Sequence, residues 1–116
     1  MTKRFGDKQR LEHMLTAIDD VLNFTAKASE TEFIRNRMMQ FACVRGLEII
    51  GEAANHLTIA LRDANPHIRW RDIVGMRNFA VHQYFDVQNQ VIWDAVRRDL
   101  PALKPQLQQA LSALST

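Results

Sequence analysis

The chain has 116 residues, which fits one compact domain and leaves no room for a second of ordinary size. Hydrophobic residues make up 47% of it, and the four glycines and three prolines are few enough to favour helices. The 15 Lys and Arg nearly balance the 13 Asp and Glu, which excludes a polybasic nucleic-acid tail and an acidic disordered chain. The single cysteine, Cys43, excludes an internal disulfide framework. Without a signal peptide or an apolar run of membrane-spanning length, we expect a cytoplasmic protein with no membrane partner.

The first half of the chain predicts two long helices. Residues 7–27 form the first, and the second runs from an N-cap at Thr31 to residue 64, before Pro66. Apolar residues recur at steps of three and four along both segments. The predicted stripe of the first helix is Leu11, Leu15, Ile18 and Leu22, with Met14 and Val21 beside it, and that of the second is Phe41, Val44, Leu47, Ile50, Ala54, Leu57 and Leu61.

The second half predicts three shorter helices. One begins near Trp70 and reaches Tyr84, and the next is capped by Asp86 and buries Val91, Trp93 or Ile92, and Val96. A break or kink at Pro101 starts the last, with Pro105 tolerated in its first turn. Because no segment alternates with period two, we expect an all-α bundle of four to five helices as a single domain over residues 1–116. Helices this long in a short chain favour a homodimer that covers a spare apolar face.

A polar stripe accompanies the apolar one on the second helix. Arg45, Glu48, Glu52 and Asn55 follow at steps of three, four and three, so they share one face. The stripe is either a solvated, salt-bridged surface or a set of side chains that orients catalytic groups. Gly51 costs about 1 kcal/mol relative to Ala in a helix, which predicts close packing against another helix.

The segment with the densest functional chemistry contains Arg77, His82 and Tyr84. An arginine can hold two phosphate oxygens, and a histidine can accept a proton from an RNA 2′-hydroxyl or donate one to a leaving oxygen. Tyrosine can position either group or stack on a base. These groups suit phosphodiester cleavage that needs no metal. On an ideal helix His82 lies about 140° from Arg77, so we expect either a distorted turn or a second protomer to complete the site, and we favour the symmetric dimer.

Each of these residues also has a structural interpretation. A lone histidine near a helix end is more often a capping or solvent-exposed residue. A lone arginine is more often a surface ion-pair partner, and Tyr84 is more often a core or interface aromatic. The remaining histidines, His13, His56 and His67, lack metal-ligand spacing with one another and are interpreted as structural or exposed. Cys43 is interpreted as a buried small hydrophobe, and Trp70 and Trp93 as core anchors.

The motif Arg77-x4-His82-x-Tyr84 resembles the R-x(4–6)-H-x-Y signature of HepT-type toxins, small ribonucleases of the HEPN superfamily. Two flanking segments support this resemblance. The helix from Arg45 to Ala53 resembles the family's E-x-x-G-E-A helix, and Ile68 to Asn78 resembles its I-x-W-x-x-I-x-G-M-R-N run. The resemblance covers almost the whole chain, in order.

The resemblance implies a HEPN-type helical bundle that dimerises around a composite ribonuclease cleft and uses no cofactor and no metal. Arg77 and His82 would be the catalytic pair, and Asn78 a supporting or RNA-binding residue. Tyr84 would contact RNA and also accept AMP from a minimal nucleotidyltransferase (MNT-type) antitoxin, which would neutralise the enzyme by adding bulk and charge at the cleft. In the functional interpretation of the polar stripe, Arg45, Glu48 and Glu52 would orient this catalytic pair.

These observations predict a metal-independent endoribonuclease of a toxin–antitoxin module. The alternative is a non-catalytic helical subunit of a nucleotidyltransferase complex, against which the intact set Arg77, His82 and Tyr84 argues. A helix-turn-helix DNA-binding protein is a weaker alternative, because residues 66–84 lack a basic recognition face and the net charge is only +2.

Overall fold

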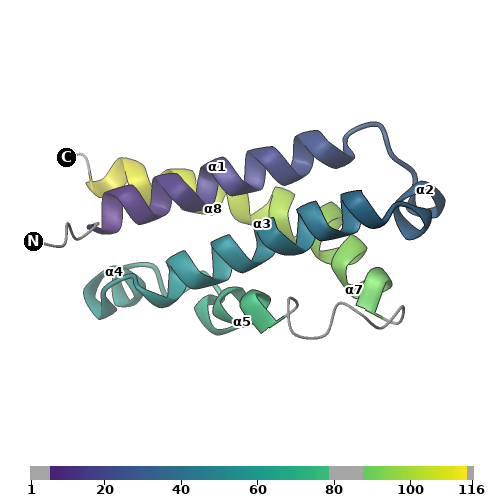
Figure 1. Cartoon of the computed structure of the whole chain (residues 1–116). Coiled ribbons are helices and arrows are strands. Elements are labelled where there is room, and N and C mark those ends of the chain that lie inside the picture. Colours follow the sequence, from purple (N-terminus) through teal and green to yellow (C-terminus); the bar gives the residue numbers. More distant parts are fainter. Residues whose placement is uncertain (1–5, 79–87, 115–116) are drawn as a thin grey trace, which may run out of the picture.

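The computed structural model describes residues 6–78 and 88–114 of the chain. Every regular element within these two ranges is helical, which confirms the predicted all-α class (Figure 1). The elements in chain order are α1 (Asp7–Thr25), α2 (Glu30–Arg35), α3 (Arg37–Asn55), α4 (Ile59–Ala64), α5 (Trp70–Gly75), the 3₁₀ turn η1 (Met76–Asn78), α7 (Gln88–Asp94), the π-helical turn η2 (Ala95–Asp99) and α8 (Leu100–Leu114). In this part of the chain, no helix is both long enough and apolar enough to cross a bilayer.

Helices α1 and α3 lie antiparallel along the length of the molecule and form its largest helix–helix contact (Figure 1). Helix α8 packs against α1, while α5 and η1 pack against α3. The two long helices approach closely at Gly46, where an added Cβ would lie 2.2 Å from Cγ2 of Val21. The molecule is elongated, with principal extents of 44 × 30 × 23 Å.

The core is formed by the predicted helical stripes, with one shift of register. On α1 the fully buried apolar residues are Leu11, Met14, Ile18 and Val21, whereas Leu15 and Leu22 pack at the edge of the core. On α3 the predicted seam is buried from Val44 to Ala54, but Phe41 at its start is exposed. The periodic pattern therefore located the buried face of each helix, and on α1 the centre of that face is displaced by about one residue from the predicted stripe.

The predicted long helix over residues 31–64 is wrong, because polar side chains interrupt it. The residue that caps α2 is Ser29 and not Thr31. The Ser29 Oγ accepts a hydrogen bond of 3.1 Å from the Glu32 amide, and the Glu32 carboxylate accepts one from the Ser29 amide. Asn36 then leaves helical geometry and caps α3 by accepting from the Met39 amide at 2.9 Å. An asparagine side chain can bind nearby backbone groups that a continuous helix would otherwise use. The chain thus turns between α2 and α3 where the apolar pattern continues.

The second interruption lies at the other end of α3. Thr58 caps α4 by accepting from the Leu61 amide at 3.2 Å, and its own hydroxyl donates to Asp7 at 2.6 Å. The Arg62 guanidinium closes the C-terminus of α3 by donating to the carbonyls of Ala54 and Asn55, both at 2.9 Å. These contacts satisfy backbone groups that a helix end leaves open.

The predicted helix from Trp70 begins as expected and tightens into a 3₁₀ turn at Met76. Its predicted continuation to Tyr84 and the cap at Asp86 lie outside the described residues. Both tryptophans are core residues, as predicted: Trp70 donates to the Asn65 carbonyl at 3.1 Å, and Trp93 packs on Phe33 with ring centroids 5.1 Å apart.

The predicted change at Pro101 takes the form of a distorted turn and not of a break, because the backbone stays helical from α7 through α8. Pro101 lies in the first turn of α8, as predicted. A π-helical turn over Ala95–Asp99 precedes the proline. A proline removes one amide and crowds the carbonyl four residues earlier, and a widened turn accommodates that defect without ending the helix. Pro105 lies inside α8, beyond its first turn. Of the residues predicted to be buried in this region, Ile92, Trp93 and Val96 are buried and Val91 is exposed.

Candidate functional site

The outward face of α3 carries the predicted polar stripe. Arg45 and Glu48 form an exposed ion pair of 2.6 Å, the salt-bridged surface that the spacing indicated. Glu52, one turn further on, contacts His56 at the end of α3 and Arg77 on η1. The Asn55 carbonyl accepts from Arg62, so this end of the stripe serves the junction between α3 and α4. The stripe therefore contains three side chains of the candidate site and one residue of a helix end.

Arg77 reaches this face because η1 packs directly on α3. The contact is made at Gly51, where an added Cβ would lie 2.7 Å from the Arg77 amide nitrogen and 3.0 Å from the carbonyl oxygens of Ile73 and Val74. All three atoms are backbone, so only glycine allows the end of α5 and η1 to lie this close. The predicted packing role of Gly51 is confirmed, and it sets the position from which the Arg77 side chain extends.

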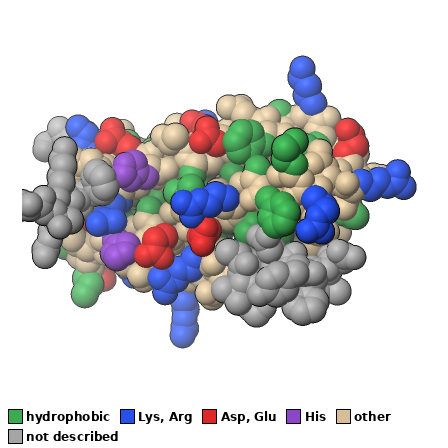
Figure 2. Space-filling model, in the orientation of Figure 1, with side chains coloured by type: hydrophobic (Ala, Val, Ile, Leu, Met, Phe, Trp, Pro, Cys, Tyr) green, Lys and Arg blue, Asp and Glu red, His purple; other side chains and the backbone are tan. Residues whose placement is uncertain are grey.

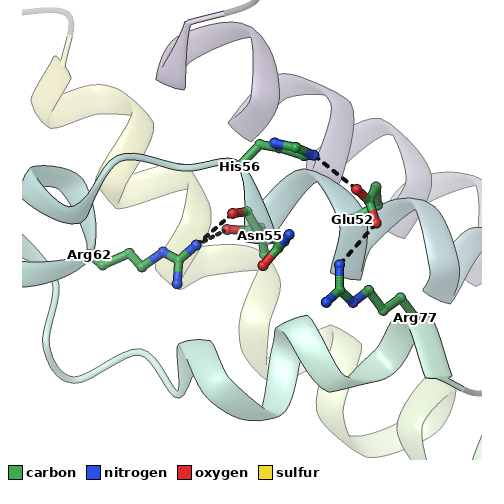
Figure 3. Close-up of polar contacts among 6 residues, drawn as sticks. Glu52, Asn55, His56, Arg62 and Arg77 are labelled. Atoms are coloured by element: carbon green, nitrogen blue, oxygen red, sulfur yellow. Dashed lines mark hydrogen bonds and ion pairs between the residues drawn. The ribbon is translucent and has the colours of Figure 1, made fainter.

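Glu52 links two basic side chains (Figure 3). Its Oε2 lies 3.3 Å from Nη1 of Arg77, and its Oε1 lies 2.9 Å from Nε2 of His56. Hydrogen bonds from His56 and then from Arg77 hold the pKa of the Glu52 carboxyl below its ordinary value, against a small opposing effect of burial. The carboxylate is therefore charged at neutral pH and can fix the direction of the Arg77 guanidinium.

An open hollow of about 780 Å³ surrounds this group, between α1, α3 and η1. Its polar lining consists of the side chains of Arg10, His13, Arg45, Glu48, Glu52, His56, Arg77 and Asn78. Figure 2 shows the charged and histidine side chains gathered over this face of α1 and α3. The apolar side chains of Ile49 and Ala53 also line the hollow. A surface that combines cations with an apolar wall suits a ligand with phosphate and ring components.

The structure brings Arg77, Asn78, Arg45, Glu48 and Glu52 to one hollow, five of the residues singled out from the sequence. His82 and Tyr84 lie outside the described residues, so their placement stays a prediction. Across residues 6–78 and 88–114, no three His, Cys, Asp or Glu side chains lie together as a metal site would require.

Sequence reasoning missed three members of this group. His56 was interpreted as structural or exposed, although its spacing of four from Glu52 places the two side chains on one helix face. Arg10 and His13 belong to α1, and nothing in the local sequence indicates that they face the same hollow as Arg77. Only the antiparallel packing of α1 on α3 joins them.

Comparison with known proteins places the chain in a family. The model of the family described as "Ribonuclease HepT-like" matches residues 14–110. A Methanocaldococcus jannaschii protein named "Putative RNase MJ1380" is 36% identical over 108 residues, covering 93% of this chain and 98% of that protein. "Probable ribonuclease HepT" of Thermococcus cleftensis is 37% identical over 97 residues, covering 84% and 88%. "Putative RNase TTE0752" of Caldanaerobacter subterraneus subsp. tengcongensis is 33% identical over 101 residues, covering 87% and 90%.

No solved structure matched the chain significantly. The family match and the curated relatives cover nearly the full length, and they agree with the helical fold. The chain belongs to the HepT-like ribonuclease family.

Proposed function

We propose that this protein is a metal-independent endoribonuclease in which Arg77 binds the scissile phosphate and His82 transfers the proton. The observation that carries the proposal is the Arg77 guanidinium, held by Glu52 at the edge of an open, cation-lined hollow. The nucleophile is the RNA 2′-hydroxyl beside the scissile phosphate. His82 removes its proton or protonates the leaving 5′-oxygen, and Arg77 stabilises the charge that develops on the phosphate oxygens.

The Arg77 side chain has the properties that this role requires. Among the described residues, its one ion pair is the contact with Glu52, and the side chain remains 40% exposed. A guanidinium offers five N–H donors in a planar fork, so donors remain for a phosphate while one is bound to the carboxylate. Glu52 acts as a positioning residue, because it limits the rotamers of Arg77 without meeting the RNA.

A second copy of the chain completes the site in this proposal. Met38, Phe41, Arg45, Glu48 and Glu52 follow one another at steps of three and four on α3, so they form a single stripe. Its first two members are exposed apolar side chains, at 79% for Met38 and 49% for Phe41. The continuity of this apolar end with the stripe that reaches Glu52 supports a homodimer whose interface includes both Arg77 hollows, the composite cleft predicted from the sequence.

The dimer is tested by light scattering over a concentration series. Met38→Asp puts a charge on the apolar end of the stripe, and we expect it to shift the protein towards monomer. Ile59→Asp is the matched control, because Ile59 is equally exposed but lies on α4. A wild-type monomer at all concentrations, or equal effects of the two substitutions, would refute the dimer interface.

Regulation is proposed to act through Tyr84. A nucleotidyltransferase antitoxin would transfer AMP from ATP to the phenolic oxygen and release pyrophosphate, which places a phosphate and a nucleoside beside the cleft. Such a group opposes an anionic RNA by charge and by bulk. The test is the intact mass of the protein after incubation with the partner and ATP. We expect a gain of one or more AMP units that Tyr84→Phe abolishes, and an unchanged wild-type mass would refute this step.

The catalytic proposal is tested with a fluorescent single-stranded RNA in buffer containing EDTA. We expect wild-type cleavage to persist in EDTA. The cleavage rates of His82→Ala and Arg77→Ala should each be at least about 100-fold lower than that of wild type. An RNA with every 2′-hydroxyl methylated should resist cleavage. Equal cleavage by wild type and His82→Ala would remove the catalytic assignment. A wild-type protein that cleaves no RNA but binds a nucleotidyltransferase tightly would favour the non-catalytic alternative.

A further inference from the structure

The hollow beside Arg77 extends to α1, beyond the residues that the catalytic proposal uses. Arg10 and His13 lie one turn apart on α1, and they line the same hollow as His56 and Arg77. The hollow has a volume of about 780 Å³. Pockets of about 300–1,000 Å³ hold ligands the size of a nucleotide or larger. There is thus room for a ligand that contacts Arg77 and also reaches α1.

The distribution of charge within the hollow singles out Arg10. Glu48 pairs with Arg45 at 2.6 Å, and Glu52 pairs with Arg77 at 3.3 Å, so each of these arginines is offset by a carboxylate. In the part of the chain that the structure describes, no carboxylate forms an ion pair with Arg10, which is half-buried at the wall of the hollow. The positive charge in excess therefore lies at the α1 end.

The apolar part of the lining narrows the class of ligand. Ile49 and Ala53 lie one turn apart on α3, each directly after one of the paired glutamates, and both line the hollow. A nucleotide has a phosphate for the arginine and a sugar and base with apolar faces for this surface. An acidic protein surface would match the cation but not the concave apolar wall.

From this arrangement we propose that Arg10 forms a second phosphate-binding subsite, which holds the RNA strand on one side of the phosphate bound by Arg77. The inference rests on the proposed ribonuclease function and adds the path of the substrate to it. The strand runs from Arg77 along the wall formed by Ile49 and Ala53 to α1. Arg10 contacts a flanking phosphate, which is not a reacting group, so it binds substrate without taking part in the chemical step.

Binding is measured by fluorescence anisotropy with a 12-nucleotide single-stranded RNA in which every 2′-hydroxyl is methylated, so that no cleavage intervenes. We expect Arg10→Gln to weaken binding about tenfold, as the loss of one charge-assisted phosphate contact does. The slope of log affinity against log salt should fall by about 0.7, the value for one phosphate on a single strand. Arg10→Lys, which keeps the charge, should restore most of the affinity.

Arg71→Gln is the matched control, because Arg71 is an exposed arginine on α5 that does not line the hollow. It makes the same change in net charge and should leave affinity within twofold and the salt slope unchanged. The circular dichroism melting curve of each variant establishes that it is folded. Equal affinities and slopes for Arg10→Gln and Arg71→Gln would overturn the inference, as would a wild-type protein that does not bind the RNA.

Cleavage kinetics separate this inference from the proposed function. With a cleavable RNA, we expect Arg10→Gln to raise KM about tenfold and to leave kcat nearly unchanged, because the contact is equally strong in the ground and transition states. If wild type cleaves RNA and Arg10→Gln behaves like Arg71→Gln, the inference fails while the proposed function stands. If wild type binds RNA through Arg10 but does not cleave it, the proposed function fails and the subsite stands.

Discussion

The contact between Gly51 and η1 allows one substitution to test how the fold positions Arg77. Gly51→Ala places a Cβ 2.7 Å from the Arg77 amide nitrogen, whereas ordinary contact begins at 3.4 Å. To restore a separation of 3.4 Å, η1 must move away from α3 by about 0.7 Å, because the opposing atoms are backbone and cannot rotate aside. The displacement would carry the Arg77–Glu52 separation from 3.3 Å to about 4 Å, the outer limit of an ion pair.

The expected effect on stability is small. Overpacking costs about 1–3 kcal/mol, and replacing glycine by alanine inside a helix returns about 1 kcal/mol. The free energy of unfolding, measured in urea, should therefore fall by about 1 kcal/mol. The effect on RNA cleavage should be larger, because a misplacement near 1 Å at a catalytic group can cost about 100-fold in rate. We expect kcat/KM to fall by at least about tenfold. The small loss of folding stability does not account for a fall of this size.

Two other glycines supply controls. An added Cβ at Gly75 meets nothing within 4 Å, so Gly75→Ala should leave both stability and cleavage near wild type. At Gly46 it would lie 2.2 Å from Cγ2 of the buried and stiff Val21, so Gly46→Ala should destabilise the α1–α3 contact at a distance from Arg77. The reasoning is refuted if Gly51→Ala is as stable and active as Gly75→Ala, or if its loss of activity per unit of lost stability equals that of Gly46→Ala.

Three further predictions concern the core and the ion pairs. The Arg97 guanidinium donates to the carbonyls of Thr25 and Ala28 and lies 4.5 Å from the centroid of the Trp93 ring, so Arg97→Met should lower the free energy of unfolding by about 2–4 kcal/mol. Arg98→Met, at the exposed neighbouring position, should change it little in the same urea titration. Burial raises the pKa of the Cys43 thiol to about 11. A maleimide at pH 8 should therefore label Cys43 only as fast as the protein unfolds. Rapid labelling of the native protein would contradict the buried, protonated state of this thiol. Because the pKa of Glu52 is lowered in the folded protein, wild type should be more stable than Glu52→Gln above the pH at which a glutamate in the unfolded chain titrates. This difference in stability should disappear as the pH falls through the lowered pKa. Parallel pH profiles of stability for the two proteins would contradict the prediction.

The sequence predicted best those features that one element carries by itself. Helix α1 was placed to within two residues at its C-terminal end, because a repeated apolar step over 19 residues has one interpretation. Gly51 was predicted to mark close packing, because a helix interior otherwise disfavours glycine. The structure adds what it packs against, which is the backbone of α5 and η1.

Predictions failed where a single side chain outweighed the periodic pattern. The apolar spacing continues past Asn36, but the amide side chain binds the Met39 amide and ends one helix as it begins the next. At Pro101 no break occurs: the proline lies in the first turn of α8, as predicted, and a π-helical turn before it keeps the chain helical. Whether a polar side chain caps a helix or points to solvent depends on the neighbouring backbone, which the periodicity does not report.

By itself, the sequence determined the helical class, the buried face of each long helix and, by resemblance, the family that the comparisons confirm. It also singled out Arg77 and Glu52. Only the tertiary structure decided that Glu52 holds Arg77 across 25 positions, that Arg97 closes the end of α1 from 72 positions away, and that Arg10 shares the hollow with both α3 and η1. Local patterns report which side of a helix avoids water. The partners of a polar side chain are set by how helices distant in the sequence pack, and no local spacing encodes that.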